Sequence, residues 1–147
     1  RHGVLAAAEL LDLRRAIREA DVVFGSAIDE LPHLAPAPTT EESARILSTG
    51  ERIIVARMGA GGSLAVQGDA CVRVPAFPIA VIDSLGAGDT FNAGYILASL
   101  EGRSLAERLR YGNATAALRL MRAGGVRGGP TRATLEAFLS EHPAPAV

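Results

Sequence analysis

Cysteine is scarce in this sequence and lysine is absent. The 147 residues contain a single cysteine, Cys71, and all 15 basic residues are arginines. One cysteine excludes an internal disulfide and is typical of a reducing, cytoplasmic setting. Cys71 lies in an alternating segment far in sequence from any partner base, so we expect a small packed or surface side chain rather than a nucleophile. The absence of lysine is a compositional bias and indicates no function.

The sequence also lacks a large net charge, a long apolar run and a cluster of metal ligands. Its formal net charge is −1, which does not favour a nucleic-acid or membrane-surface partner. No apolar run approaches the roughly 20 residues needed to span a bilayer. No His/Cys cluster has metal-ligand spacing, and His33 is expected in a surface loop. With 48% hydrophobic residues, the chain is long enough for one domain with its own core.

Helical and strand patterns alternate along the chain, which is typical of an α/β domain with a parallel sheet. Expected helices cover residues 5–20, 40–50, 90–100, 105–120 and 131–139. Expected strands cover residues 21–24, 52–57, 64–66, 71–74 and 79–82. The prolines from Pro32 to Pro38 predict an irregular connection, and residues 142–147 predict a frayed tail.

The most informative stretch is Asp83-Ser-Leu-Gly-Ala-Gly-Asp-Thr90, between the apolar run 79–82 and a helix. A strand that breaks into glycines and enters a helix presents several N–H groups in one direction, so it attracts phosphate. Asp89 is the unusual element, because a carboxylate repels bound phosphate. A proton acceptor for an attacking hydroxyl, beside donors that stabilise a transferring phosphoryl group, accounts for it. In the alternative interpretation, Asp89 merely caps the helix.

The segment from Asp83 to Phe91 resembles the C-terminal signature of the ribokinase-like (PfkB) family of sugar and nucleoside kinases, with Ser84 in place of the commoner threonine. The resemblance implies the nucleotide-binding C-terminal half of a three-layer α/β/α domain with a mainly parallel central sheet. It also implies ATP and Mg²⁺ as cofactors and a small sugar-like substrate. Asp89 would be the general base, and the amides of Gly86, Ala87 and Gly88 would form the anion hole.

The same resemblance assigns further positions near the nucleotide. The turn after the strand 21–24 stands where the family has an N-x-x-E motif, which helps to order the magnesium and phosphate region. Ser26 stands at the asparagine position and Asp29 at the glutamate position, with Glu30 as a near alternative. An N-capped helix with acidic residues in its first turn explains this turn equally well. The remaining assigned positions are a phosphate-contacting arginine, two loop glycines and a base or ribose contact, namely Arg57, Gly59, Gly62 and Asn113.

Gly59-Ala-Gly-Gly62 resembles the family's G-x-x-G loop, and a plain β-turn is its alternative. Asn113 could instead lie on a solvated helix face. Some relatives hold a potassium-like ion beside the anion turn. By position, that site would use Asp83, the carbonyl of Leu85 and backbone groups at Arg119, Arg122, Gly124 and Gly128. A glycine-rich helix end and linker is the ordinary alternative.

The resemblance covers only the C-terminal half of a ribokinase-like protein. We therefore expect residues 1–141 to form the nucleotide-binding part of a kinase domain, without the N-terminal sugar-binding half and lid, and residues 142–147 to form a tail. A homo-oligomer or a second polypeptide could complete the site. Two other functions stay open: a non-catalytic nucleotide-binding or regulatory module, and a dinucleotide-binding oxidoreductase domain. The oxidoreductase is disfavoured because no G-x-G-x-x-G follows a first strand.

Overall fold

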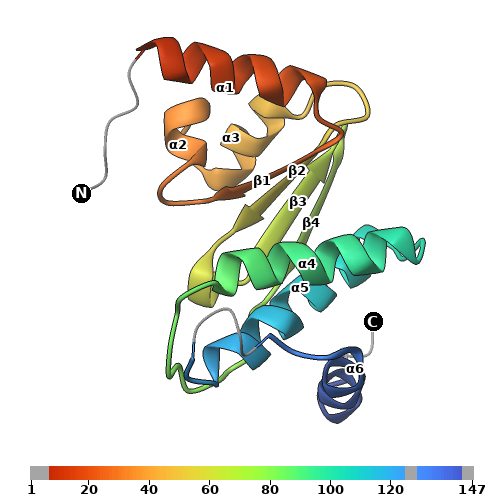
Figure 1. The fold of residues 1–147 in the computed structure, drawn as a ribbon. Coiled ribbons are helices and arrows are strands. Elements are labelled where there is room, and N and C mark those ends of the chain that lie inside the picture. Colours follow the sequence, from red (N-terminus) through yellow and green to blue (C-terminus); the bar gives the residue numbers. More distant parts are fainter. Residues whose placement is uncertain (1–6, 125–128, 144–147) are drawn as a thin grey trace. The chain divides into compact units, whose positions relative to one another are not determined.

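The described part of the chain divides into two compact units. The computed structural model describes residues 7–124 and 129–143. The N-terminal unit contains residues up to 59 together with 63–73, and the C-terminal unit contains residues 60–62 and those from 74 onward. Figure 1 labels the elements of both. Each unit is described by itself below.

A four-stranded sheet forms the centre of the N-terminal unit. Its strands are β1 (Val22–Ser26), β2 (Ile53–Arg57), β3 (Ser63–Gln67) and β4 (Ala70–Val74), in the order β1-β2-β3-β4. The pairing of β1 with β2 is parallel, whereas β2 and β3 are antiparallel, with Arg57 opposite Ser63. The sheet is therefore mixed, which corrects the expectation of mainly parallel strands. The connection from Arg57 to Ser63 is too short for the crossover that a parallel pair of strands requires.

Helices cover one face of this sheet in Figure 1. They are α1 (Ala7–Glu19), α2 (Leu31–Leu34) and α3 (Thr40–Leu47). Thr39 and Glu42 form a reciprocal capping box that fixes the start of α3. The core joins α2 and α3 to the central strands, and its buried residues are Leu31, Ala44, Ile54, Ala56, Leu64 and Val66. The short helix α2 corrects the expected irregular connection, because buried Leu31 and Leu34 anchor it despite Pro32.

The C-terminal unit is a bundle of helices α4 (Ala87–Leu100), α5 (Leu105–Leu120) and α6 (Arg132–Glu141). A reciprocal capping box of Ser104 and Glu107 starts α5. Helices α4 and α5 pack closely because Gly94 leaves room for Thr115: a Cβ at Gly94 would lie 2.2 Å from the Thr115 Oγ1 atom. A second core lies between α5 and α6 and includes Ala114, Ala117, Leu118, Leu135 and Phe138.

The expected strand at residues 79–82 does not form. This segment contains no strand, and Val81 and Ile82 are 61% and 64% exposed. Instead, the amides of Ile82 and Asp83 both donate to the Leu120 carbonyl, at 2.8 and 3.2 Å. A strand needs a neighbouring strand for its hydrogen bonds, and here the backbone turns to the end of α5 for them.

His142, the first residue of the expected tail, packs against the end of α6. The His142 ring stacks on Phe138 with centroids 4.2 Å apart, and its amide donates to the Phe138 carbonyl. His142 therefore belongs to the packed end of α6 rather than to a frayed tail.

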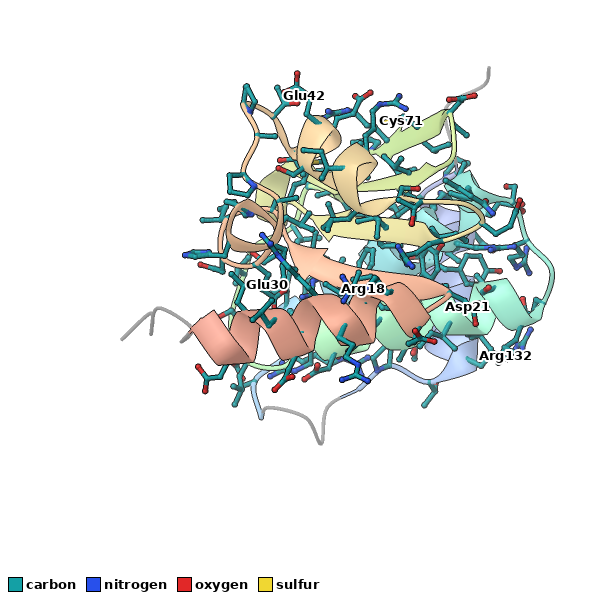
Figure 2. All side chains as sticks on the ribbon, turned by 90° about the horizontal axis from the view of Figure 1, so that it is seen from above. Arg18, Asp21, Glu30, Glu42, Cys71 and Arg132 are labelled. Carbon is teal, nitrogen blue, oxygen red and sulfur yellow. The ribbon has the colours of Figure 1, made fainter. Side chains whose placement is uncertain are left out.

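Within the described ranges, the helices lack the length and apolar character that a membrane crossing would demand. His33 is exposed as predicted, but it lies in α2 rather than in the expected surface loop. Cys71 on β4, labelled in Figure 2, is partly buried. Burial raises the pKa of its thiol, so the expectation of an unreactive side chain fits its surroundings.

We predict that Gly94→Ala lowers the free energy of unfolding by about 2 kcal/mol, since the added methyl group must push α4 away from α5. Besides Thr115, that methyl group would meet the Tyr111 carbonyl at 2.8 Å. Urea denaturation measures the change. Ile96→Ala on the same helix is the control, since Ile96 is 47% exposed and its truncation should cost less than about 1 kcal/mol. Equal losses for the two variants would contradict the close packing at Gly94.

Candidate active site

The glycine turn enters α4 through a residue in the left-handed conformation. Gly86 is the N-cap residue, with φ of 77°, which favours glycine over any other residue. Thr90 fastens the turn, because both its amide and its hydroxyl donate to the Gly86 carbonyl, at 3.0 and 2.8 Å. The Ala87 amide donates to the Ser84 carbonyl at 3.3 Å, a long bond that an anion bound at this turn would have to share.

Asp89 lies in the first turn of α4 and is exposed. It lines a cavity of about 330 Å³ that is formed by α4, α5 and the start of α6. The other lining residues include Thr90, Ala93, Gly94, Leu97, Thr115 and Leu135. A carboxylate at the edge of a mostly apolar cavity, next to a helix start, is well placed to meet a hydroxyl group.

Asp83 stabilises the N-terminal end of the glycine turn. Its Oδ1 atom accepts the Leu85 amide at 3.0 Å, and its Oδ2 atom is 2.8 Å from Nη2 of Arg119. The Arg119 side chain is 0% exposed. Its Nη1 atom donates to the Arg122 carbonyl at 2.6 Å. These contacts bring together four of the positions assigned to a potassium-like ion. The link between Asp83 and Arg122 is the Arg119 guanidinium, a side-chain role that the sequence did not predict.

The structure describes one of the last two positions assigned to that ion. Gly124 has φ of 110° and is exposed, and no contact places it beside Asp83. Gly128 lies outside the described residues.

In the N-terminal unit, the turn after β1 brings its assigned residues together. The Ser26 amide donates to Oε2 of Glu30 at 2.6 Å, and the Ser26 hydroxyl donates to Oδ2 of Asp29 at 3.1 Å. Glu30 also pairs with Arg57 of β2, at 3.3 Å. Glu30 therefore closes the turn onto β2, and Asp29 projects from an exposed position. Among the described residues, no group of three or more acidic, His or Cys side chains could hold a metal ion.

Both loop glycines have positive φ, as expected for a G-x-x-G loop. Gly59 has φ of 56° and begins the short helix η1 (Gly59–Gly61), and Gly62, which follows it, has φ of 87°. A Cβ at Gly62 would lie 2.1 Å from the Val74 carbonyl oxygen, so only glycine fits there.

Asn113 is buried, at 7% exposure, and does not lie on a solvated helix face. Its Nδ2 atom donates to the carbonyls of Val74 and Pro75, at 3.2 and 3.1 Å. It thereby fixes the backbone against which Gly62 packs, which is a supporting role that the sequence did not predict. A contact between Asn113 and a base or ribose stays a prediction.

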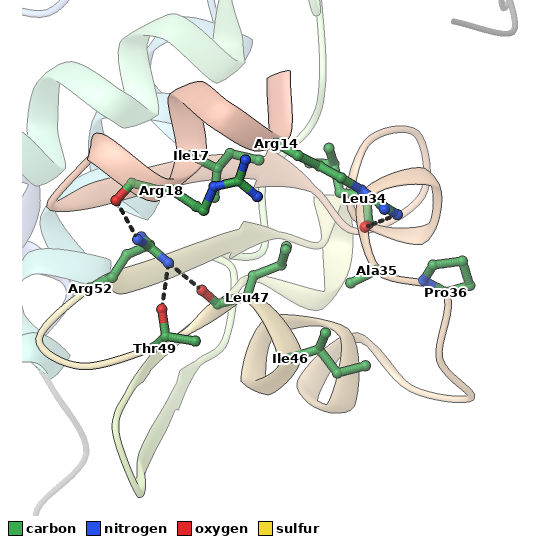
Figure 3. A pocket seen from close by; sticks show the side chains of 10 residues that line it. All are labelled: Arg14, Ile17, Arg18, Leu34, Ala35, Pro36, Ile46, Leu47, Thr49 and Arg52. Atoms are coloured by element: carbon green, nitrogen blue, oxygen red, sulfur yellow. Dashed lines mark hydrogen bonds between the residues drawn. The ribbon is translucent and has the colours of Figure 1, made fainter. Parts of the chain in front are cut away.

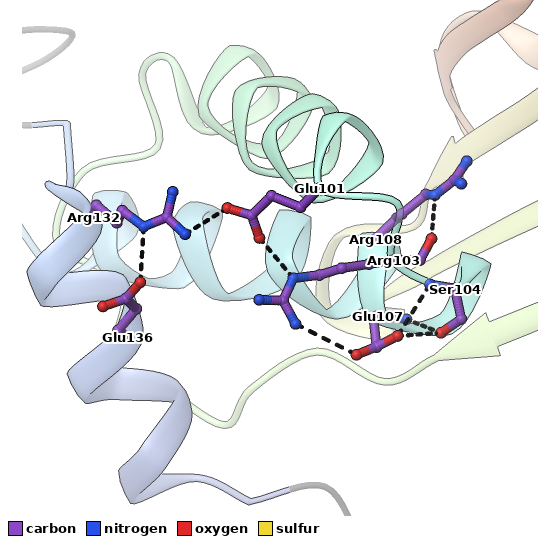
Figure 4. A network of polar contacts seen from close by, with 7 residues as sticks. All are labelled: Glu101, Arg103, Ser104, Glu107, Arg108, Arg132 and Glu136. Carbon is purple, nitrogen blue, oxygen red and sulfur yellow. Dashed lines mark hydrogen bonds and ion pairs between the residues drawn. The ribbon is translucent and has the colours of Figure 1, made fainter.

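A chain of ion pairs ties the ends of the three C-terminal helices together (Figure 4). Glu101, just after α4, pairs with Arg103 at 2.8 Å and also with Arg132 of α6 at 2.5 Å. Arg103 in turn reaches Glu107 of the α5 capping box at 3.5 Å. The hydrogen bond from Arg103 lowers the pKa of Glu101, with further help from Arg132. These charges hold the wall of the cavity that Asp89 lines.

Another cavity, of about 410 Å³, lies in the N-terminal unit between α1, α2 and α3 (Figure 3). None of the predicted site residues lines it. Its most buried arginine, Arg52, donates to carbonyls of Ala20, Leu47 and Arg18. Arg52 thus holds the ends of α1 and α3 together, and we assign no ligand to the cavity.

Comparison with known proteins identifies the family. The model of the pfkB family carbohydrate kinases matches residues 4–132, well over half of the chain. The chain belongs to this family. The ribokinase-like resemblance and the α/β fold class expected from the signature are therefore confirmed.

Individual relatives of this pfkB-family chain are sugar kinases. A ribokinase of Bacillus subtilis is 42% identical over 69 residues, which are 47% of this chain and 24% of that protein. A 5-dehydro-2-deoxygluconokinase of Clostridium perfringens is 29% identical over 129 residues, 84% of this chain and 38% of that protein. The structure of Arabidopsis thaliana ribokinase with ribose and ATP matches with a TM-score of 0.78 and 26% identity, over 86% of this chain and 43% of that one. This chain therefore spans less than half the length of these relatives.

We predict that Glu101 makes the C-terminal unit sensitive to acid. Because the pKa of Glu101 is lowered in the folded state, its contribution to stability is present at neutral pH and is lost as pH falls through the lowered value. Thermal unfolding of Glu101→Gln should therefore differ from the parent most near pH 7, with the difference shrinking towards about pH 3. Glu51→Gln is the control, an exposed carboxylate without an ion pair among the described contacts. A constant difference across this pH range would contradict the linkage.

Proposed function

We propose that the chain forms the nucleotide-binding part of an ATP-dependent sugar kinase, with Asp89 as its general base. The observation that carries this proposal is the position of Asp89. It lies three residues after the left-handed Gly86, in the first turn of α4, and lines a cavity of sugar size. Membership of the pfkB family supports the reaction class, and the relative solved with ribose and ATP supports a sugar acceptor and this nucleotide.

In the proposed reaction, the Asp89 carboxylate accepts the proton of the acceptor hydroxyl. The hydroxyl oxygen forms a bond to the γ-phosphorus of ATP as the bond to the bridging oxygen breaks, and ADP leaves. The amides of the Gly86–Gly88 turn would face the transferring phosphoryl group, with the helix dipole behind them. Phosphoryl transfer asks for little covalent chemistry from the protein, so a placed base and aimed donors suffice.

The remaining assigned residues would hold the nucleotide and its metal. Arg57 and Ser26 would contact phosphates, and the positive-φ backbone at Gly59 and Gly62 would lie close to the nucleotide. The carboxylates of Asp29 and Glu30 offer the hard oxygen ligands that magnesium prefers, and both residues are exposed. Magnesium bound there would neutralise phosphate charge.

A nucleotide-binding module without turnover is the second candidate. Ser26 and Asp29 stand where the family motif has asparagine and glutamate, so the order of the metal and phosphates could be weakened. In that case ATP would bind and no sugar would be phosphorylated.

We predict that Asp89→Asn lowers kcat by about 10²- to 10⁴-fold, because an amide cannot accept the proton. The Kd for ATP should change less than about threefold, since the nucleotide does not depend on this carboxylate. ADP release over a panel of sugars and calorimetric ATP titration measure the two quantities. Asp69→Asn in the exposed β3–β4 turn is the matched control and should leave both unchanged. Turnover that survives in Asp89→Asn would overturn the base role, and ATP binding without turnover in the parent would favour the second candidate.

A further inference from the structure

Arg119 is a buried cation in a place where helix ends usually expose their arginines. Its side chain is 0% exposed, and it lies on the stripe of α5 that also contains buried Gly112 and Thr115. Its Nε atom is buried without an acceptor among the described residues. Removing a guanidinium from water costs several kcal/mol before any partner repays it. A buried guanidinium whose Nε atom has no acceptor among the described residues is therefore not explained by a gain in stability alone.

The hydrogen-bond partners of Arg119 indicate the role of its charge. The guanidinium binds the Asp83 carboxylate at 2.8 Å and the Arg122 carbonyl at 2.6 Å. Asp83 connects Arg119 to the turn, because its other carboxylate oxygen accepts the Leu85 amide at 3.0 Å. The amides of Ile82 and Asp83 also donate to the Leu120 carbonyl. The segment that leads into Gly86 is thus tied to the end of α5 by a carboxylate, a carbonyl and one positive charge.

A potassium-like ion does not fit this arrangement. Two of the oxygens that would bind it, on Asp83 and at Arg122, already accept from the guanidinium. An added cation in contact with either oxygen would stand within a few ångströms of the fixed positive charge of Arg119, whose side chain is buried, and like charges repel. The positive charge that a bound ion would supply is already part of the chain.

We propose that the Arg119 guanidinium takes the place of a monovalent cation beneath the anion turn, so that this kinase needs no potassium. Arg119 is then a positioning residue: it neutralises Asp83 and fixes the turn before α4. The inference rests on the proposed function only in taking the Gly86–Gly88 turn as the phosphate site.

Thermal unfolding tests this proposal without any need for kinase activity. The parent protein should unfold at the same temperature in potassium chloride and in tetramethylammonium chloride of equal ionic strength. Arg119→Met removes the positive charge and keeps the apolar stem, so that the Asp83 carboxylate loses the guanidinium. Its melting temperature should be lowered in tetramethylammonium chloride and should rise by about 3 °C as potassium replaces it, as expected for a ligand that binds only the folded state.

Arg110→Met is the matched control on the same helix. Arg110 is partly buried and donates to the backbone carbonyls of Leu139 and His142, and its described contacts include no carboxylate. Its loss should destabilise the protein equally in both salts. Specific stabilisation of the parent by potassium, or an Arg119→Met variant that responds to potassium no more than Arg110→Met, would overturn the proposal.

Crystals of the parent soaked in rubidium chloride keep the proposal testable if Arg119→Met fails to fold. Rubidium has the charge of potassium and a similar radius, and its anomalous signal locates it directly. We expect no rubidium within bonding distance of the Asp83 carboxylate. A rubidium ion bound there would contradict the inference and would leave the proposed phosphoryl transfer, which the Asp89→Asn kinetics test, untouched.

Discussion

The Asp83 carboxylate, held between the Leu85 amide and the Arg119 guanidinium, is the interaction on which the proposed site depends. The segment before α4 has no strand to hold it, so its backbone depends on these bonds and on the Leu120 carbonyl. Gly86 then turns the chain into the helix through the left-handed conformation. An anion turn stabilises a transition state only if its amides are fixed before the charge arrives.

The N-terminal unit shows how a departure from the family motif can be accommodated. Ser26 replaces an amide side chain with a hydroxyl, which donates to Asp29, while Glu30 accepts the Ser26 amide and pairs with Arg57. Asp29 and Glu30 thus have different environments although the sequence left them interchangeable. Asp29 accepts the Ser26 hydroxyl at 3.1 Å, and the ordering of a hydrated metal by its carboxylate stays part of the proposed function.

Much of the fold followed from local signals in the sequence. The capping boxes at Thr39 and Ser104, the glycines at Gly59, Gly62 and Gly86, and the hairpin after β3 all act through neighbouring residues, so a short window of sequence contains their cause. The strand expected at 79–82 failed because apolar character alone does not supply a neighbouring strand. Likewise, α2 depends on the burial of Leu31 and Leu34, which no local pattern around the prolines reveals.

The sequence predicts the motif of the proposed site, but not the side chains that hold its backbone in place. Asp89 and Gly86 were found because the signature is contiguous. The roles of Arg119 and Asn113 depend on partners 36 and 38 or 39 positions away, so single-sequence reasoning gave the first a backbone role and the second a ligand contact. One signal was available: Arg119 lies seven residues after Gly112, on the buried stripe of α5.

A crystal structure with ADP, magnesium, aluminium fluoride and an acceptor sugar tests the central claim most directly, because the fluoride complex imitates the phosphoryl group in transfer. We expect an Asp89 oxygen at about 2.6–3.2 Å from the acceptor hydroxyl and the amides of the Gly86 turn directed at the fluoride. An Asp89 side chain turned away from the hydroxyl, or a fluoride complex bound elsewhere, would contradict the account.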